Sequence, residues 1–380
     1  MSGAIAEALA TALTEGVRQA GCSWQVRRAW PADLKDPGAG VVCELIGGDG
    51  GVVGGRLRSA PGTAGAPTWE VIPEDPALPA LSPLRADGWT VLAHRLGKRA
   101  VLRHDASPAF RKLATPKATR RAVTRLEAVN RQLTAARSGG DRGVPLAPEV
   151  IHADLAAGIL DLAPAPGVSL RDLLTDPATR LEQAEVAGRL VGSGLVALAR
   201  VEAEPGDDLP GHTLADEAMV LTRWTAAATA LAIVDENAAR ELRAESEAIC
   251  RDLYAAGQGA AAPAVLTHRD VHDGQILVDG AATPVLLDWD TACWADPCVD
   301  PANLLAHLDL LRDHVPDATD RIAAATAGLW AGLLVGDHPA LAQPLRLELL
   351  RRASAARIAA VHAFRGRVRS SERNARPARR

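Results

Sequence analysis

The stretch LTHRDVHDGQILVDG (residues 266–280), followed by PVLLDWDTACWADPCVDPANLL (residues 284–305), is the densest polar cluster in an otherwise apolar part of the chain. Short apolar runs lead into Asp270 and into Asp288, which is the pattern of short strands that each end in a polar loop. Gln275 follows Asp270 after five residues. We therefore expect two carboxylates and one carboxamide to gather at neighbouring strand ends.

This expected group of oxygen ligands suits Mg²⁺, which takes few carboxylates and leaves room for phosphate oxygens. It does not suit zinc, which favours His and Cys ligands. His268 and His272 are four residues apart, but they flank a predicted turn and form no H-E-x-x-H motif. We therefore expect a magnesium site, beside which His268 hydrogen-bonds the loop instead of reacting.

The spacing H-x-D-x(4)-Q, continued by D-W and D-P-x-x-D, resembles the aminoglycoside phosphotransferase and choline kinase superfamily. The typical signature of that superfamily is H-G-D-x-H-x-x-N followed by I-D-W-x(6)-D-P-x-x-D. The resemblance covers roughly residues 89–330. It implies an α+β fold of the bilobal protein-kinase type, with a small antiparallel-sheet N-lobe and a mostly helical C-lobe. It also implies a kinase that uses ATP and Mg²⁺ to phosphorylate a hydroxyl of a sugar, amino sugar, aminoglycoside-like antibiotic or other small polar molecule.

The resemblance implies a role for each polar residue of the motif. Asp270 matches the catalytic base that orients the acceptor hydroxyl, and Gln275 and Asp288 match the metal ligands. His272, two residues after Asp270, is a candidate contact to the acceptor.

Two residues upstream of the motif complete the expected nucleotide site. Lys112 lies in a predicted strand and is one of only four lysines among 42 basic residues. The resemblance implies that Lys112 binds the nucleotide phosphates. It also implies that Glu127, fifteen residues further on in the following helix, pairs with this lysine.

Three residues depart from the superfamily signature. Gln275 replaces the usual Asn, as it does in some maltokinase-like sugar kinases; Arg269 replaces Gly, and Ala295 replaces the common Gly of the D-P-x-x-D segment. None of these changes removes a charged catalytic group, so we expect activity. The departures leave one alternative open, a catalytically inactive nucleotide-binding regulatory protein of the same fold.

Each candidate residue also has a purely structural interpretation. The structural alternatives are a turn residue (Asp270), a strand cap (Asp288), a solvated loop residue (Gln275), an exposed strand lysine (Lys112) and a solvated ion pair (Glu127). Asp296 and Asp300 are each followed by proline, and we expect both to have structural roles at a turn or a helix start.

The first 88 residues precede the kinase-like part. Residues 4–20 have the apolar period of an amphipathic helix, and Asp49-Gly50 marks a hairpin turn. Predicted strands cover 24–30, 41–46 and 52–58, and residues 59–88, rich in Pro, Ala and Gly, read as a loop or boundary. Some sugar kinases of the superfamily carry an N-terminal cap, so by analogy we interpret residues 1–88 as an α/β cap.

The next segment predicts the order β-β-β-α-β-β over residues 89–162. Gly97-Lys98 marks a hairpin, and Thr115-Pro116 supplies the N-cap and first-turn proline of a helix that runs to about residue 136. The expected domains are an N-lobe over 89–165, a helical C-lobe with the catalytic loop over 166–366, and a disordered basic tail over 367–380.

Composition excludes several other classes of protein. The 380 residues are 48% hydrophobic and 23% charged, with a net charge of −4, which argues against disorder and against a nucleic-acid-binding protein. No stretch has the ~20 apolar residues of a membrane span, and the N-terminus lacks signal-peptide features. Five cysteines without C-x-x-C spacing favour reduced thiols, so we expect a cytoplasmic protein. The Arg-rich tail leaves open a contact to nucleic acid or membrane.

Overall fold

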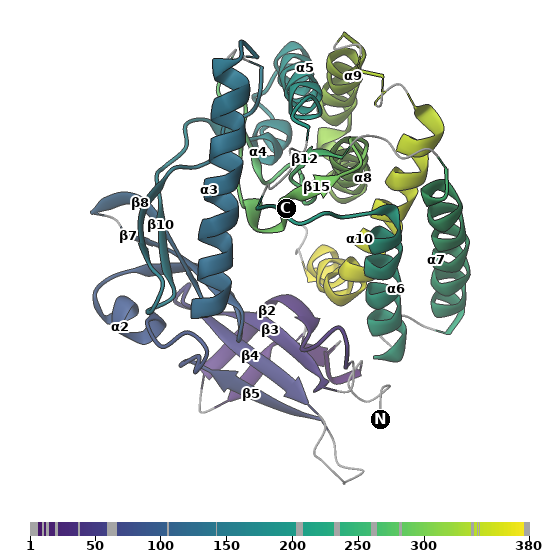
Figure 1. The fold of residues 1–380 in the computed structure, drawn as a ribbon. Helices are drawn as coiled ribbons and strands as arrows, with labels where there is room; N and C mark the ends of the chain where they lie inside the picture. Colours follow the sequence, from purple (N-terminus) through teal and green to yellow (C-terminus); the bar gives the residue numbers. More distant parts are fainter. Residues whose placement is uncertain are drawn as a thin grey trace.

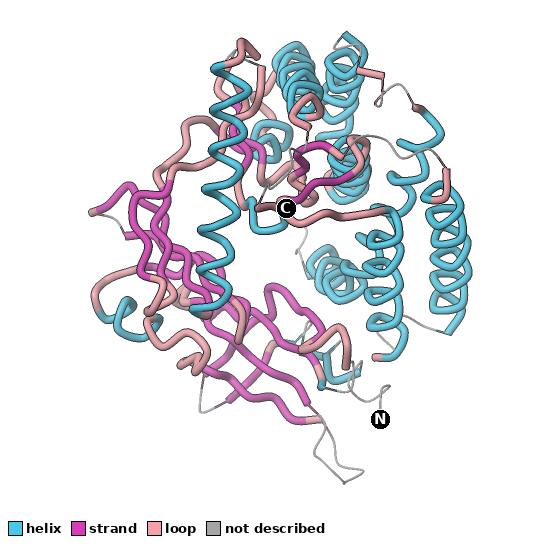
Figure 2. Tube along the Cα trace, viewed as in Figure 1, coloured by secondary structure: helices cyan, strands magenta, loops and turns pink. Residues whose placement is uncertain are grey.

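The computed structural model describes most of the chain between residues 7 and 375. The residues in this span that it does not describe are 10, 13–14, 20–21, 37–38, 59–66, 105, 142, 203–207, 232–235, 260–263, 281–282, 336–337, 340 and 342. The fold is α+β, as the sequence predicts, with antiparallel sheets in the N-terminal part and helices in the C-terminal part (Figures 1 and 2).

The first sheet is an antiparallel meander in the order β1-β2-β3-β4-β5. Its strands are β1 (Val17–Gln19), β2 (Cys22–Pro31), β3 (Val41–Gly47), β4 (Val52–Arg58) and β5 (Thr68–Ile72). The predicted strands β2, β3 and β4 are confirmed, and so is the hairpin turn between β3 and β4. Strand β5 lies in the segment predicted as loop. The helix predicted over 4–20 is too long, because the described residues from 7 to 15 are helical but residues 17–19 pair with β2.

The second sheet has the order β6-β7-β8-β10-β9 and carries helix α3. Its elements are α2 (Leu81–Ala86), β6 (Thr90–Arg95), β7 (Arg99–His104), β8 (Ser107–Ala114), α3 (Pro116–Ser138), β9 (Val150–Asp154) and β10 (Ile159–Leu162). Thr115 caps α3 by accepting a hydrogen bond from the backbone N–H of Ala118. The predicted β-β-β-α-β-β order is confirmed, and the short helix α2 precedes it.

The C-terminal part is mainly helical. Its helices are α4 (Leu170–Thr175), α5 (Leu181–Leu198), α6 (Leu214–Ala230), α7 (Glu236–Gly257), α8 (Val299–His314), α9 (Thr319–Val335) and α10 (Pro344–Ala375), with the 3-10 turns η2 (Trp289–Thr291) and η3 (Pro316–Ala318). The short strands are β11 (Val168–Ser169), β12 (Val265–Thr267), β13 (Ile276–Val278), β14 (Val285–Leu286) and β15 (Cys293–Ala295). Helix α10 continues to Ala375, into the stretch whose composition predicts disorder, and residues 376–380 lie outside the described residues.

The first sheet connects the second sheet to the C-terminal helices (Figure 1). On one side, Gly54 packs so closely on β6 and its turn that an added Cβ would lie 2.8 Å from Cδ1 of Leu96. On the other side, the buried core of this sheet includes Leu231 just after α6 and Ala360 on α10. The apolar side chains of the first 58 residues therefore bury themselves against both halves of the molecule, and this fixes the sheet beside the space between them.

None of the helices that the structure describes combines the length and the hydropathy that a membrane-spanning helix requires.

Candidate active site

A buried carboxylate fixes the backbone of the loop after β12. Asp300, at the start of α8, accepts hydrogen bonds from the backbone N–H groups of His268 and Arg269, each at 2.7 Å. Arg269 has a positive φ of 68°, which a non-glycine residue adopts only under such constraint. Burial raises the pKa of Asp300, while the hydrogen bonds from the two N–H groups oppose that rise. The structural role expected for Asp300 is confirmed, because it fixes the backbone that leads into Asp270.

His268 joins the loop to the strand end that carries Asp288. Its ring lies 2.7 Å from the carbonyl oxygen of Leu287 through Nε2, and Nδ1 accepts the backbone N–H of Asp270 at 3.3 Å. The ring also packs on Trp289, with centroids 4.6 Å apart. This pattern places the proton on Nε2. His268 therefore connects the loop to this strand end through hydrogen bonds, as the sequence predicts.

The carboxamide of Gln275 faces Asp270. Nε2 of Gln275 donates to Oδ2 of Asp270 at 3.4 Å, and the backbone carbonyl of Gln275 accepts from the N–H of Leu287. Oε1 of Gln275 is buried and has no hydrogen-bond partner among the described residues. A buried amide oxygen without a donor is costly unless a ligand satisfies it. The oxygen is therefore available to a cation or to a bound molecule.

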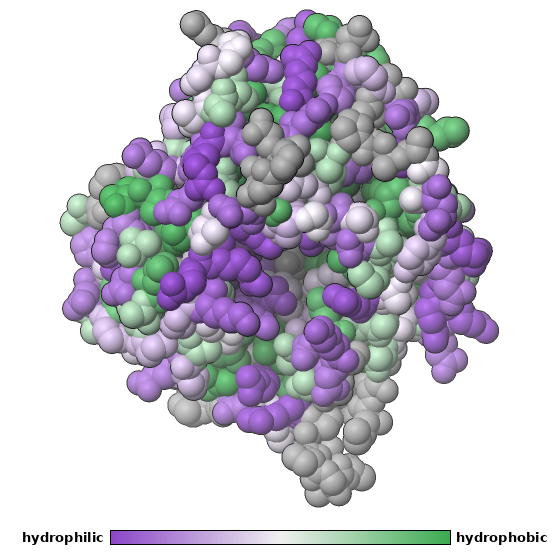
Figure 3. Space-filling view, in the orientation of Figure 1, coloured by the Kyte–Doolittle hydropathy of each residue, from purple (hydrophilic) through white to green (hydrophobic). Residues whose placement is uncertain are grey.

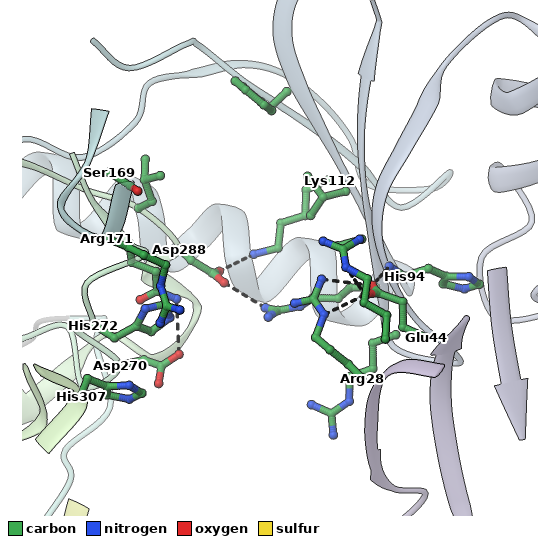
Figure 4. Close-up of a pocket in the computed structure, with 18 of the residues that line it drawn as sticks. Arg28, Glu44, His94, Lys112, Ser169, Arg171, Asp270, His272, Asp288 and His307 are labelled. Carbon is green, nitrogen blue, oxygen red and sulfur yellow. Dashed lines mark hydrogen bonds and ion pairs between the residues drawn. The ribbon is translucent and has the colours of Figure 1, made fainter. Parts of the chain in front are cut away.

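Asp288 lies just after β14 and forms ion pairs with two basic side chains of the second sheet (Figure 4). Its Oδ1 is 2.7 Å from Nζ of Lys112 on β8, and its Oδ2 is 3.1 Å from Nη1 of Arg99 on β7. Burial raises the pKa of Asp288, but Lys112 and Arg99 outweigh burial and hold the pKa well below its usual range. Asp288 is therefore a carboxylate at any physiological pH, and it adopts a left-handed backbone conformation with φ 64°.

Lys112 has a second carboxylate partner, which differs from the one expected. Its Nζ lies 2.6 Å from Oδ2 of Asp290, and Arg125 on α3 donates to the backbone carbonyl of Asp290. Glu127 is exposed on α3, and no ion pair between Glu127 and Lys112 is present among the described residues. Because residues two apart point to nearly opposite sides of a helix, Glu127 lies away from the side on which Arg125 reaches Asp290. The pairing expected from the fifteen-residue spacing is therefore not formed here.

Arg99 and Asp290 are two site residues that the sequence analysis missed. Asp290 left a signal, because it is a second acid two residues after Asp288 in the segment LLDWD. Arg99 directly follows the Gly97-Lys98 turn, but the sequence gives no signal of its role. Arg makes up nearly all of the basic residues, so one more does not stand out.

Arg99, Lys112, Asp270, Gln275 and Asp288 line one cavity of about 1250 Å³. The cavity extends from Lys112 and Asp288 past Asp270 and His272 to α10 and to strand β2. Figure 3 shows a hollow bordered largely by hydrophilic residues between the second sheet and the C-terminal helices. Asp270, Gln275, Asp288, Lys112 and His272, all predicted from the sequence, share this cavity, whereas Glu127 does not line it.

The oxygen atoms of the cavity suit a hard cation such as Mg²⁺. Asp288 supplies a carboxylate, and Gln275 supplies the unpartnered amide oxygen. Among the described residues, no group of three or more His, Cys, Asp or Glu side chains is arranged to hold a metal ion. A cation here would therefore need ligands from a second molecule, as Mg²⁺ does when it binds together with phosphate oxygens.

Comparisons with known proteins give one family and several related folds. The family model described as phosphotransferase enzyme family matches residues 85–345. No curated protein matches the chain significantly. Among solved structures, a glucosamine kinase with glucosamine, ADP and inorganic phosphate has 18% identity and a TM-score of 0.48, with coverage of 98% of this chain and 97% of the other.

Two further structures come from named organisms. An aminoglycoside phosphotransferase from Streptomyces rimosus has 17% identity and a TM-score of 0.45, and covers 73% of this chain and 97% of its own. A macrolide 2'-phosphotransferase from Brachybacterium faecium has 20% identity and a TM-score of 0.42, and covers 79% of this chain and 99% of its own.

Proposed function

The chain belongs to the phosphotransferase enzyme family, and on this basis we propose that it transfers the γ-phosphoryl group of ATP to a hydroxyl of a small polar molecule. The observation that carries the proposal is the convergence of Asp270, Gln275, Asp288 and Lys112 on one cavity. Asp270, Gln275 and Asp288 lie close together in the sequence, whereas Lys112 on β8 lies 176 residues before Asp288. Their chemistry is that of phosphoryl transfer.

Asp270 is the proposed base. Its carboxylate lines the cavity beside Gln275 and is not engaged by a cation at ion-pair distance among the described residues. It would accept the hydrogen bond of the acceptor hydroxyl and hold the oxygen in line with the phosphorus. Because phosphoryl transfer needs positioning more than covalent chemistry, an aspartate of ordinary basicity suffices for this role.

The proposed nucleotide side of the cavity combines Lys112 and Arg99 with Asp288 and Gln275. Gln275 and Asp288 would hold Mg²⁺, which neutralises charge on the phosphate oxygens when it is bound. Lys112 and Arg99 lie at the same carboxylate, so both cations are within reach of phosphates that approach Asp288. Glu127 has no role in this proposal.

Residues 1–88 are proposed to act as a cap that shapes the acceptor site. Strand β2 contributes Gln25, Arg27, Arg28 and Trp30 to the cavity wall. The protein is also proposed to work in the reducing cytoplasm, where its five cysteines would remain free thiols.

The test is ADP release by the purified protein with Mg·ATP and a panel of hydroxyl compounds. Acceptor-dependent ADP release that is lost in Asp270→Asn supports the proposal. Stabilisation by ATP without turnover on any acceptor favours the alternative, a regulatory protein that binds nucleotide without transfer. Unchanged turnover in Asp270→Asn would remove the role assigned to this residue.

A further inference from the structure

The part of the cavity beyond Asp270 is rich in basic groups. We call it the acceptor half and define it as the wall formed by β2, β3, β6, α4, α8, α10 and His272. Its basic side chains are Arg27, Arg28, Arg95, Arg171, Arg357, His94, His272, His307, His314 and His362. Its acids, apart from Asp270, are Glu44 and Asp172. The buried Asp273 pairs with Arg171 and Glu44 pairs with Arg28, so the excess of positive charge that attracts an anion rests on the remaining arginines.

Of these two acids, Glu44 is committed to partners inside the protein, whereas Asp172 is exposed. Glu44 is fully buried, and its carboxylate accepts from Nε of Arg28 at 2.8 Å and from the backbone N–H of His94 at 2.7 Å. Asp172 belongs to the first turn of α4, where its side chain accepts the hydroxyl of Ser169 at 2.7 Å. Among the described residues that line this half of the cavity, an ammonium group would therefore find a carboxylate without a basic partner only at Asp270 and at the exposed Asp172.

Arg357 and His307 carry polar atoms that lack partners. Nε of Arg357, on α10, and Nδ1 of His307, on α8, are both buried without a hydrogen-bond partner among the described residues. Burial, followed by the charges of His272 and Arg357, lowers the pKa of His307 well below its usual value, so the ring is neutral at neutral pH. A buried polar atom without a hydrogen-bond partner is unfavourable, and a suitable ligand removes that cost.

A hydrogen-bond path connects Arg357 to the loop that carries the base. Arg357 donates to Oδ1 of Asn303, and Nδ2 of Asn303 donates to the backbone carbonyl of Val271 at 2.8 Å. The ring of His307 lies 5.1 Å from that of His272, two residues after Asp270. Figure 4 shows His272 and His307 beside Asp270, away from Lys112. Arg357 and His307 are therefore adjacent to the proposed site of phosphoryl transfer.

We propose that the acceptor carries an anionic group, a carboxylate or a phosphate ester, close to the hydroxyl that receives the phosphoryl group, and that Arg357 and His307 bind this anion. The inference rests on the proposed phosphotransferase function. Arginine forms charge-assisted hydrogen bonds to both kinds of oxyanion, and the neutral imidazole of His307 donates to the anion in the tautomer that carries its proton on Nδ1. Amino sugars and aminoglycosides, which carry ammonium groups, are disfavoured because the acceptor half presents them with like charge.

The first experiment compares matched acceptors in the ADP-release assay. The pairs are gluconate against sorbitol, and glucuronate and glucose 6-phosphate against glucose and glucosamine. We expect kcat/KM for the anionic compounds to exceed that of their neutral and amino counterparts by about tenfold or more, the effect of one charge-assisted hydrogen bond. Equal values, or a preference for glucosamine, would overturn the inference while leaving the kinase function intact.

The second experiment uses variants and does not depend on catalysis. Arg357→Gln is compared with Arg352→Gln, a control on the same helix whose side chain is largely exposed and lies 3.6 Å from Asp252. Calorimetric titration of gluconate and sorbitol without nucleotide should show binding of the acid only, weakened about 10–100-fold in Arg357→Gln and unchanged in Arg352→Gln. Thermal unfolding of each variant checks its fold, and imidazole NMR signals of the wild-type protein report the same binding without any substitution. Absence of a difference between gluconate and sorbitol in the wild-type protein rejects the anion site, whereas failure to bind Mg·ATP rejects the phosphotransferase proposal.

Discussion

Nζ of Lys112 lies 2.7 Å from Oδ1 of Asp288, although 176 residues separate them in the chain. The same ammonium group lies 2.6 Å from Asp290, so one lysine of the second sheet contacts two carboxylates of the C-terminal part. Protein kinases pair the corresponding lysine with a glutamate of the helix that follows. In this chain, Lys112 forms ion pairs with Asp288 and Asp290, and none with Glu127 among the described residues.

Substitution of Asp290 tests this arrangement. We expect Asp290→Asn to lower kcat/KM for ATP about tenfold or more, because Lys112 loses one of its two charge-assisted partners. Glu127→Gln should leave this value unchanged, because Glu127 is exposed and lies on another side of α3. Steady-state kinetics at varied ATP measures both. A larger loss in Glu127→Gln than in Asp290→Asn would restore the pairing that the sequence predicts.

Substitution of Asp270 tests the proposed base. Asp270→Asn keeps the size of the side chain but removes the charge that holds the acceptor hydroxyl, so kcat should fall by about 10²–10⁴-fold with little change in nucleotide affinity. Asp279→Asn, a change at an exposed acid after β13, is the matched control and should have wild-type activity. Rates of ADP release and calorimetric binding of Mg·ATP give the two quantities. Comparable activity in both variants would rule out the assigned role.

Acid should weaken the contact between the first sheet and β6 through Asp75. This buried carboxylate accepts from Nε2 of His94 at 3.0 Å and from the backbone N–H of Gly97 at 2.7 Å. Burial raises the pKa of Asp75, but these hydrogen bonds outweigh burial and the pKa is lowered. Its stabilising effect is therefore complete above the unfolded-state pKa of about 4 and is lost as pH falls through the folded-state pKa.

We accordingly expect Asp75→Asn to cost about 1–3 kcal/mol of unfolding free energy at pH 7, because the amide leaves a buried donor unpaired. The difference from the wild-type protein should shrink once the pH falls below about 4. Asp87→Asn, at an exposed position after α2, serves as control. Urea unfolding monitored by fluorescence at a series of pH values measures the effect, and a difference that grows on acidification would contradict the assigned sign.

Because α5 packs closely on α9, we expect the substitution of one glycine at this contact to destabilise the protein. A Cβ on Gly188 would lie 2.0 Å from the carbonyl oxygen of Ala325. We expect Gly188→Ala to destabilise the protein by about 1–3 kcal/mol, because the helices must separate. Helix propensity alone would stabilise the same variant by about 1 kcal/mol, so the sign of the change decides. Gly48→Ala, whose Cβ would meet nothing within 4 Å, is the control, and thermal unfolding is the measurement.

Sequence reasoning worked where a short pattern has one local solution. The short apolar runs of β3 and β4 with Asp49-Gly50 between them form the predicted hairpin, and Thr115-Pro116 starts the predicted helix. It failed where the pattern was short or ambiguous. Strand β5 has five residues inside a segment rich in Pro and Gly, and it forms because it pairs with β4. Spacing alone placed Glu127 in the right helix but did not determine its side of that helix.

By itself, the sequence determined the class of the fold and identified Asp270, Gln275 and Asp288 as candidate site residues, because these depend on residues close together in the chain. Only the tertiary structure determined which cations lie against Asp288 and which line the rest of the cavity. Arg99 and Lys112 come from the second sheet, and Arg357 comes from the last helix. The physical reason is that electrostatic interactions depend on distance in space and on burial, and folding alone brings these separated charges into one cavity.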